Sequence, residues 1–318
     1  MNLLTAMRYL VALHDQRHFD RAAKACHITQ PALSNALRAL EREMGTAIVR
    51  RGRTYSGLTA EGEQVLATAR RMLREHESLQ QSLASRQGQP VGGLRLGVVP
   101  SAVPVATRFC ALLQARHPGV SPVLLSLPSG EIEAGLRALS LDLGLGFLER
   151  VNARGSGFQV VPQYQERLYL VTRAPRPARA KASPASRIGE PMAWADTDGL
   201  DLCLLTPDMH NRSIVDAAFA RAGVAVKPVM ETNSVLSLSL AVRAGSLASV
   251  MPGALVSSLR EQPGLLFRPL VRPEVQTAVG FLVRREVALT RVQEAALALA
   301  RDADWRAELA ASSGSFRP

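Results

Sequence analysis

The stretch His27-Ile28-Thr29-Gln30-Pro31-Ala32-Leu33-Ser34 decides the fold of the N-terminal part of the chain. Thr29 is a good helix N-cap, and Pro31 suits the first helical turn because its missing N–H would have no intrahelical acceptor there. Apolar residues then recur every three or four positions up to Gly45, a typical residue after a helix end. We therefore predict that one helix stops near residue 27 and a new one runs from about residue 29 to 44.

Two helices are predicted before this one. Residues 2–14 carry apolar side chains at helical spacing, and a short helix at 19–26 directs Ala22, Ala23 and Cys26 inward. After Gly45, two short apolar segments flank a basic, glycine-containing turn at residues 50–57, which indicates a β-hairpin. The N-terminal region is therefore predicted to be all-α with a wing.

A long helix is predicted over residues 59–87, with Thr59 as its cap. The side chains along one side of this helix recur in alternating steps of four and three residues, which is the spacing of a coiled-coil seam. We therefore expect the helix to dimerise the chain. The seam consists of Val65, Ala69, Met72, His76, Leu79 and Leu83. His76 would set the register or make dimerisation pH-sensitive. Glycine and proline at residues 88–93 end the helix and mark a domain boundary.

From residue 94 the chain alternates short apolar strands with amphipathic helices. This alternation predicts α/β architecture with parallel sheets, and the number of strands suggests two sheets. The expected strands are 94–99, 123–127, 142–148, 168–172, 202–205 and 248–251, and the expected helices are 106–116, 131–139, 212–222 and 234–244. Residues 173–188, rich in Pro, Ala and Arg, are predicted to form a mobile surface loop, with a second phosphate-binding tract as the alternative.

Composition indicates a soluble globular protein that binds an anionic partner. The formal net charge is +11, and residues 1–58 hold nine Lys/Arg against four Asp/Glu, as expected of a surface that meets phosphates. The three cysteines are widely spaced, which favours a reducing compartment over a disulfide framework. We find no signal-peptide pattern and no apolar run long enough to span a bilayer, so a cytoplasmic location is expected.

Motifs of catalysis or metal binding are missing from the sequence. It contains no G-x-S-x-G, G-x-G-x-x-G or P-loop pattern, and His14 and His18, although four residues apart, lack the glutamate of an HExxH motif and a third ligand. We therefore expect no enzymatic activity, no cofactor and no metal.

The N-terminal region carries an ordered set of residues at fixed spacing, namely Phe19, Ala22-Ala23, Thr29-Gln30-Pro31-Ala32-Leu33-Ser34, Leu37, Leu40-Glu41, Gly45, Arg51 and Leu58-Thr59-Ala60-Glu61-Gly62. This pattern closely resembles that of the LysR-type transcriptional regulators. The resemblance implies a winged helix-turn-helix at 1–58 and a linker helix at 59–89. It also implies a two-lobed effector domain of the type 2 periplasmic-binding-protein kind at 90–310 and a tail at 311–318. Lobe I would comprise about 90–161 and 267–310, and lobe II about 162–266.

The candidate DNA-binding residues lie on the second helix of the motif and on the wing. Side chains at the start of a recognition helix reach base edges or phosphates in the major groove, and wing arginines suit the minor groove or the backbone. The candidates are Thr29, Gln30, Pro31, Ser34, Asn35, Arg38, Arg51 and Arg53. For Pro31 a framework role is the alternative, and Arg38 could instead pair with Glu41 on the helix surface.

A second candidate site lies where the resemblance places the effector, between the two lobes. Hydroxyl and backbone N–H groups at strand ends and helix starts would suit a small carboxylate without an arginine. Its residues are Ser101, Ala102, Ser129, Gly130, Phe147, Thr206, Asn233 and Val250. The alternative for each Ser or Thr is an ordinary helix cap.

We therefore expect a sequence-specific regulator that activates or represses a promoter in response to a small organic acid. Its expected partners are double-stranded DNA, the effector and further copies of itself, in a homodimer and then a homotetramer, with RNA polymerase as a candidate. One alternative is a cytosolic α/β small-molecule-binding protein or enzyme without specific DNA binding. Another is a cysteine-based redox-sensing regulator, although Cys110 and Cys203 are expected in different lobes.

Overall fold

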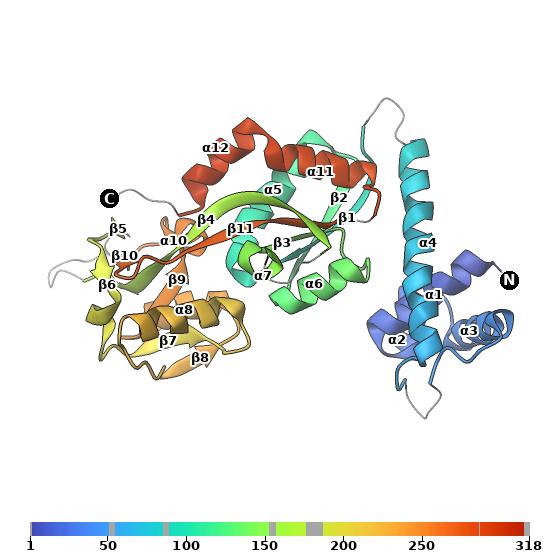
Figure 1. The fold of residues 1–318 in the computed structure, drawn as a ribbon, viewed down its shortest axis with the longest axis horizontal. Helices are drawn as coiled ribbons and strands as arrows, with labels where there is room; N and C mark the ends of the chain where they lie inside the picture. The colour runs from blue at the N-terminus through green and yellow to red at the C-terminus, as the bar shows by residue number, and fades with distance from the viewer. Residues whose placement is uncertain are drawn as a thin grey trace. The chain divides into compact units, whose positions relative to one another are not determined.

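The computed structural model describes residues 2–50, 55–84, 89–152, 157–175, 187–285 and 287–314. The chain divides into two compact units, Met1–Gly88 with Ala138–Ser140, and Gln89–Arg137 with Leu141–Pro318. Figure 1 shows a helical N-terminal unit and an α/β C-terminal unit, as the sequence predicted.

The N-terminal unit begins with the three predicted helices, α1 (Leu3–Gln16), α2 (Phe19–Ala25) and α3 (Gln30–Met44). Thr29 caps α3, since its Oγ1 accepts a hydrogen bond from the backbone N–H of Ala32 at 3.4 Å. Gly45 ends it in the left-handed conformation, at φ 67°. The three helices share one apolar core, which includes Leu10, Leu13, Ala22, Ala23, Leu33, Leu37 and Leu40.

The wing and the long helix complete this unit. Val49 and Leu58 form an antiparallel bridge, and the N–H of Arg50 donates to the carbonyl of Gly57 at 3.0 Å. The turn that carries Arg51 and Arg53 lies outside the described residues. The long helix, α4, is described over Ala60–Ala84, and Thr59 Oγ1 accepts from the N–H of Gly62 at its start.

The first half of the C-terminal unit, which we call lobe I, is built on a parallel sheet. Strand β1 (Gly92–Val98) pairs with β2 (Val120–Ser126) and with β3 (Leu143–Phe147). In Figure 1, α5 (Val103–Arg116), α11 (Arg291–Arg301) and α12 (Ala303–Ser312) cover one face, and α6 (Ser129–Arg137) covers the other. Helix α7 (Leu148–Asn152) follows β3, and the short helix η2 (Pro100–Ala102) follows β1.

Lobe II repeats this arrangement. Strand β7 (Leu202–Leu205) pairs in parallel with β8 (Met230–Thr232) and β9 (Ala248–Pro252). Helix α8 (His210–Arg221) packs on one face with Phe219 and Trp194, whereas α9 (Val235–Ala244) packs on the other with Leu238. Alternate residues of β7 belong to the two cores, as expected for a strand buried on both faces.

Long antiparallel strands join the two lobes. Strand β4 (Phe158–Arg173) pairs with β11 (Gln276–Arg284) along its first part and with β9 and β10 (Leu265–Val271) along its second. Helix α10 (Gly253–Leu259) follows β9. The short strands β5 (Arg187–Ile188) and β6 (Met192–Ala193) pair with β10, and the short helix η3 (Trp194–Thr197) follows β6.

The parallel pairings predicted from the sequence are confirmed, but the prediction of two separate sheets is wrong. One path of hydrogen-bonded strands runs β2-β1-β3-β11-β4-β9-β7-β8. The prediction failed because β4 is one continuous strand of 16 residues that serves both lobes, and only its second part has a strongly apolar sequence. Much of the loop predicted at 173–188 lies outside the described residues.

Candidate DNA interface and ligand cavity

The start of α3 carries the predicted base-reading residues on an ordered framework. The side-chain amide of Gln30 donates to the hydroxyl of Ser34 at 3.1 Å, so the two side chains lie one turn apart on the same face. Pro31 and Asn35 are exposed, whereas Leu33 is buried in the core. The N-terminal half of α3 therefore offers polar groups outward while its apolar face holds it to α1 and α2.

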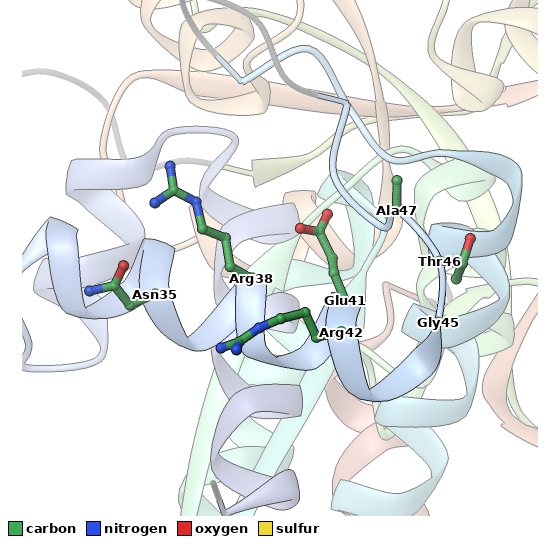
Figure 2. Close-up of a pocket in the computed structure, with 7 residues that line it drawn as sticks. All are labelled: Asn35, Arg38, Glu41, Arg42, Gly45, Thr46 and Ala47. Atoms are coloured by element: carbon green, nitrogen blue, oxygen red, sulfur yellow. The ribbon is translucent and has the colours of Figure 1, made fainter.

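Further along α3, the exposed face becomes basic. Asn35, Arg38 and Arg42 project from the helix beside a surface groove of about 670 Å³, which ends at residues Gly45, Thr46 and Ala47 (Figure 2). Neither guanidinium has a hydrogen bond or ion pair with any described residue. Both cations are thus available to an outside anion. The sequence reasoning selected Arg38 but missed Arg42, although its position two turns from Asn35 was a signal for it.

Glu41 has a structural role in this groove. Its Oε1 accepts hydrogen bonds from the backbone N–H groups of Ile48 and Val49, at 3.0 and 3.1 Å. These contacts tie the end of α3 to the first strand of the wing. The surface pair between Arg38 and Glu41, weighed from the sequence, is not among the ion pairs of the described residues.

A cavity of about 450 Å³ lies between the two lobes of the C-terminal unit. Both lobes contribute to its wall. Lobe I supplies Pro128, Ser129, Gly130, Glu131 and Arg150, and lobe II supplies Pro207, Asp208, Met209, His210 and Ser213.

Three of the predicted hydroxyl groups have unsatisfied hydrogen-bonding capacity, and one of them, that of Ser129, lies on the wall of this cavity. Ser101 Oγ, Ser129 Oγ and Thr206 Oγ1 are buried and have no hydrogen-bond partner among the described residues. They follow β1, β2 and β7, respectively, at the carboxyl ends of these strands. Helix caps would have used these oxygens, so the capping alternative does not hold for them. Because buried polar groups are normally hydrogen-bonded, the orphaned hydroxyl of Ser129 on the cavity wall indicates a place for a polar ligand.

The remaining predicted effector residues are less closely associated with the cavity. Phe147 ends β3, and its ring packs edge to face on His210 with the centroids 5.0 Å apart. Ala102 is buried in the core of lobe I and Val250 in that of lobe II, whereas Asn233 is exposed between β8 and α9.

Two hydrogen-bond donors at the cavity, Arg150 and His210, were missed by the sequence reasoning, which expected no arginine. Arg150 donates to Glu133 from Nε at 3.2 Å and from Nη2 at 3.1 Å, so the buried carboxylate of Glu133 holds it in place. His210, at the start of α8, donates from Nε2 to Glu149 Oε1 at 3.0 Å. Neither belongs to a sequence motif, since each acquires its significance only when α7 and α8 come together.

None of the three cysteines lines the cavity, and Cys26 is half-buried at the end of α2. Cys203 is buried in β7, and Cys110 packs on the core of lobe I. Burial raises the pKa of the Cys110 thiol to about 11 and also raises that of Cys26 and Cys203. No cluster of three potential metal ligands occurs among the described residues. Nor does any helix in the described ranges combine the length and apolar character of a membrane span.

A helix-turn-helix that presents polar and basic side chains, followed by a two-lobed α/β unit, defines a DNA-binding transcriptional regulator with a C-terminal regulatory domain. Comparison with family models gives the particular family. The model described as "Bacterial regulatory helix-turn-helix protein, lysR family" matches residues 4–63, and "LysR substrate binding domain" matches residues 87–305. The chain belongs to the LysR family of transcriptional regulators.

Individual relatives agree with this assignment. The DNA-binding transcriptional dual regulator OxyR of Escherichia coli K12 is 29% identical over 280 residues, which cover 87% of this chain and 88% of OxyR. A full-length OxyR variant from Pseudomonas aeruginosa superposes with a TM-score of 0.68 at 25% identity, over 94% of this chain and 97% of that one. CbnR in complex with its target DNA has the same fold, with a TM-score of 0.63 at 20% identity, over 94% and 98% of the two chains.

Proposed function

We propose that this regulator activates or represses its promoter in response to a small anionic metabolite, an organic acid, that binds between the two lobes. The observation that carries the proposal is the orphaned hydroxyl of Ser129 on the wall of a cavity that both lobes line; the orphaned hydroxyls of Ser101 and Thr206 follow strands of the two lobes at their carboxyl ends. A carboxylate accepts hydrogen bonds from hydroxyl and backbone N–H groups, and the first N–H groups of α6, at Ser129 and Gly130, have no intrahelical acceptor. Arg150 adds positive charge at the same cavity, and His210 adds a ring N–H donor.

Two observations weigh against redox sensing through the cysteines, despite the similarity to peroxide sensors. Several relatives, including one from Haemophilus influenzae, are named hydrogen peroxide-inducible genes activators. A reactive cysteine is an accessible thiolate with a lowered pKa. Here burial raises the pKa of all three thiols, and none of them lines the cavity. A bound metabolite therefore accounts for the site better than thiol oxidation does.

The exposed side of α4 supports the proposal that the regulator is a homodimer. Met72, Leu79 and Leu83 of the predicted seam are 39, 57 and 71% exposed in the single chain. A second copy of the same helix would remove these side chains from water through a coiled coil. We further propose that the effector domains pair to form a tetramer in the cytoplasm, with RNA polymerase as a candidate partner.

For DNA recognition, we propose that Gln30, Ser34 and Asn35 read base edges. Thr29 and Pro31 shape the start of α3, and Arg38, Arg42, Arg51 and Arg53 contact the phosphate backbone or the minor groove. The N-terminal turns of a recognition helix enter the major groove, whereas basic groups further along reach the phosphates. In this arrangement Ser34 contributes to specificity and the arginines contribute mainly to affinity.

Fluorescence anisotropy with the DNA upstream of the protein's own gene, measured over a salt series, tests the DNA-binding proposal. We expect Ser34→Ala to weaken binding to this DNA by about 1–3 kcal/mol and to leave binding to random DNA of equal length unchanged. A thermal unfolding curve equal to that of the wild type would show that the variant is folded. Equal loss on both DNAs would contradict a specificity role for Ser34.

A further inference from the structure

The contact between His210 and Glu149 joins the two lobes beside the proposed effector cavity. Glu149 lies on α7 in lobe I, and His210 begins α8 in lobe II. Their 3.0 Å hydrogen bond brings a carboxylate of the protein onto a cavity-lining group that could otherwise bind an outside carboxylate. The side chain of His210 is only 19% exposed, whereas that of Glu149 is 50% exposed. The more buried side chain of His210 is thus held in place, whereas the more exposed side chain of Glu149 can move away from it.

Three further contacts fix His210, two of them at its imidazole and one at its backbone carbonyl. Its ring packs on Phe147 of lobe I, and Ser213, one turn along α8, donates to its backbone carbonyl at 2.7 Å. The Oγ of Ser213 also lies 3.4 Å from Nδ1. Nε2 is the ring nitrogen that meets Glu149, so it is the atom at which an outside carboxylate would take the place of Glu149.

The surroundings of Glu149 show why it can be displaced. The neighbouring residue Arg150 is held by Glu133 and not by Glu149. Among the described residues, His210 is the ion-pair partner that the structure gives to Glu149. A half-exposed polar contact of this kind contributes little free energy, whether or not the histidine is charged, so an anion bound by other groups as well can replace it.

We propose that Glu149 is an internal competitor of the effector, whose carboxylate occupies His210 until an anionic ligand takes its place. The ligand's carboxylate would then be shared between His210 of lobe II and Ser129 of lobe I, and the lobes would be joined through the ligand instead of through Glu149. This inference rests on the proposed effector site and adds the residue that sets its affinity. It implies that the natural effector carries at least one carboxylate or another anionic group of similar size.

The test is the affinity of the full-length protein for sodium acetate, the smallest carboxylate probe, measured by thermal shift and calorimetry at constant ionic strength. Glu149→Gln should bind acetate about two- to fivefold more tightly, the range expected for releasing a half-exposed ion pair. His210→Gln should bind it more weakly than the wild type. Acetamide, which has the same shape without the charge, should show no difference between the wild type and Glu149→Gln.

Glu131→Gln is the matched control, because Glu131 is an exposed carboxylate on the wall of the same cavity. If it tightens acetate binding as much as Glu149→Gln does, the effect is general electrostatics and the proposal is wrong. The double variant Glu149→Gln/His210→Gln should bind acetate no better than His210→Gln alone, since the two residues act through one contact. Full additivity would overturn the proposal.

Ser129→Ala separates this inference from the proposed function. If Ser129→Ala weakens acetate binding but Glu149→Gln does not tighten it, the site stands and the competitor is rejected. If neither variant alters acetate binding, both the site and the competitor are rejected. Unfolding temperatures of the unliganded variants show whether each is folded, and His210→Asn replaces His210→Gln if the latter does not fold.

Discussion

The two functional surfaces of this regulator expose their polar groups in opposite ways. On α3, Asn35, Arg38 and Arg42 face solvent, and the two arginines need no partner within the described residues because water satisfies them until DNA arrives. In the two lobes, Ser101, Ser129 and Thr206 carry buried hydroxyls that no described residue satisfies, and Ser129 lines the cavity between the lobes. A surface that binds a large polyanion can rely on exposed charge, whereas a cavity for a small ligand must remove polar groups from water in advance.

A buried group near the junction of the lobes gives the largest expected effect. Glu166 of β4 is fully buried, where its carboxyl accepts hydrogen bonds from Tyr164 and the N–H of Ala254, and burial raises its pKa to about 8 from an ordinary 4.5. The folded protein therefore keeps a proton that the unfolded chain releases, so the free energy of unfolding should fall as pH rises from about 4.5 to 8. Since one pKa unit is worth about 1.4 kcal/mol, the loss should reach a few kcal/mol.

Urea denaturation at several pH values checks this expectation. Glu166→Gln, which cannot ionise, should remove most of the decrease, whereas the exposed Glu131→Gln should keep it. Parallel pH profiles for the wild type and Glu166→Gln would show that Glu166 is not the group responsible.

The N-terminal unit has its own tightly packed point at Gly62, in the first turn of α4. A β-carbon at this position would overlap the backbone carbonyl of Ile48, on the first strand of the wing. Gly62→Ala should therefore destabilise this unit by about 1–3 kcal/mol, as overpacking does, and weaken DNA binding with it. The neighbouring exposed residue provides the control, since Gln64→Ala should leave the unfolding temperature unchanged. An equally stable Gly62→Ala protein would contradict the packing described here.

A smaller effect is expected at the exposed surface of α3. Removing a phosphate contact should lower the affinity for all DNA sequences alike and reduce the slope of log affinity against log salt by about 0.9. Arg42→Ala should show both changes in anisotropy titrations, and Arg42→Lys should keep most of the slope because it keeps the charge. If the slope of Arg42→Ala equals that of the wild type, Arg42 does not contact phosphate.

The difference between the two surfaces also explains which of their residues could be predicted from the sequence and which could not. The DNA-binding helix was predicted with its cap, its end and its exposed face, because Thr29, Pro31 and Gly45 act within one short segment. Ser129 and Thr206 were predicted from their places after apolar strands. Arg150 and His210 were missed because no local pattern marks them, and only the approach of α7 and α8 brings them to one cavity. Similarly, the continuity of β4 through both lobes is a long-range feature, which local periodicity does not encode.

The central claim is that a small organic acid acts through the cavity between the lobes to alter DNA binding. Its most direct test is a panel of organic acids added to the wild-type protein on its own upstream DNA, with anisotropy for affinity and footprinting for the contacted region. The account predicts that at least one acid changes the affinity or the footprint of the wild type and has little effect on Ser129→Ala, whose DNA binding without ligand is normal. An acid that acts equally on both proteins, or a panel in which none acts on the wild type, would contradict it.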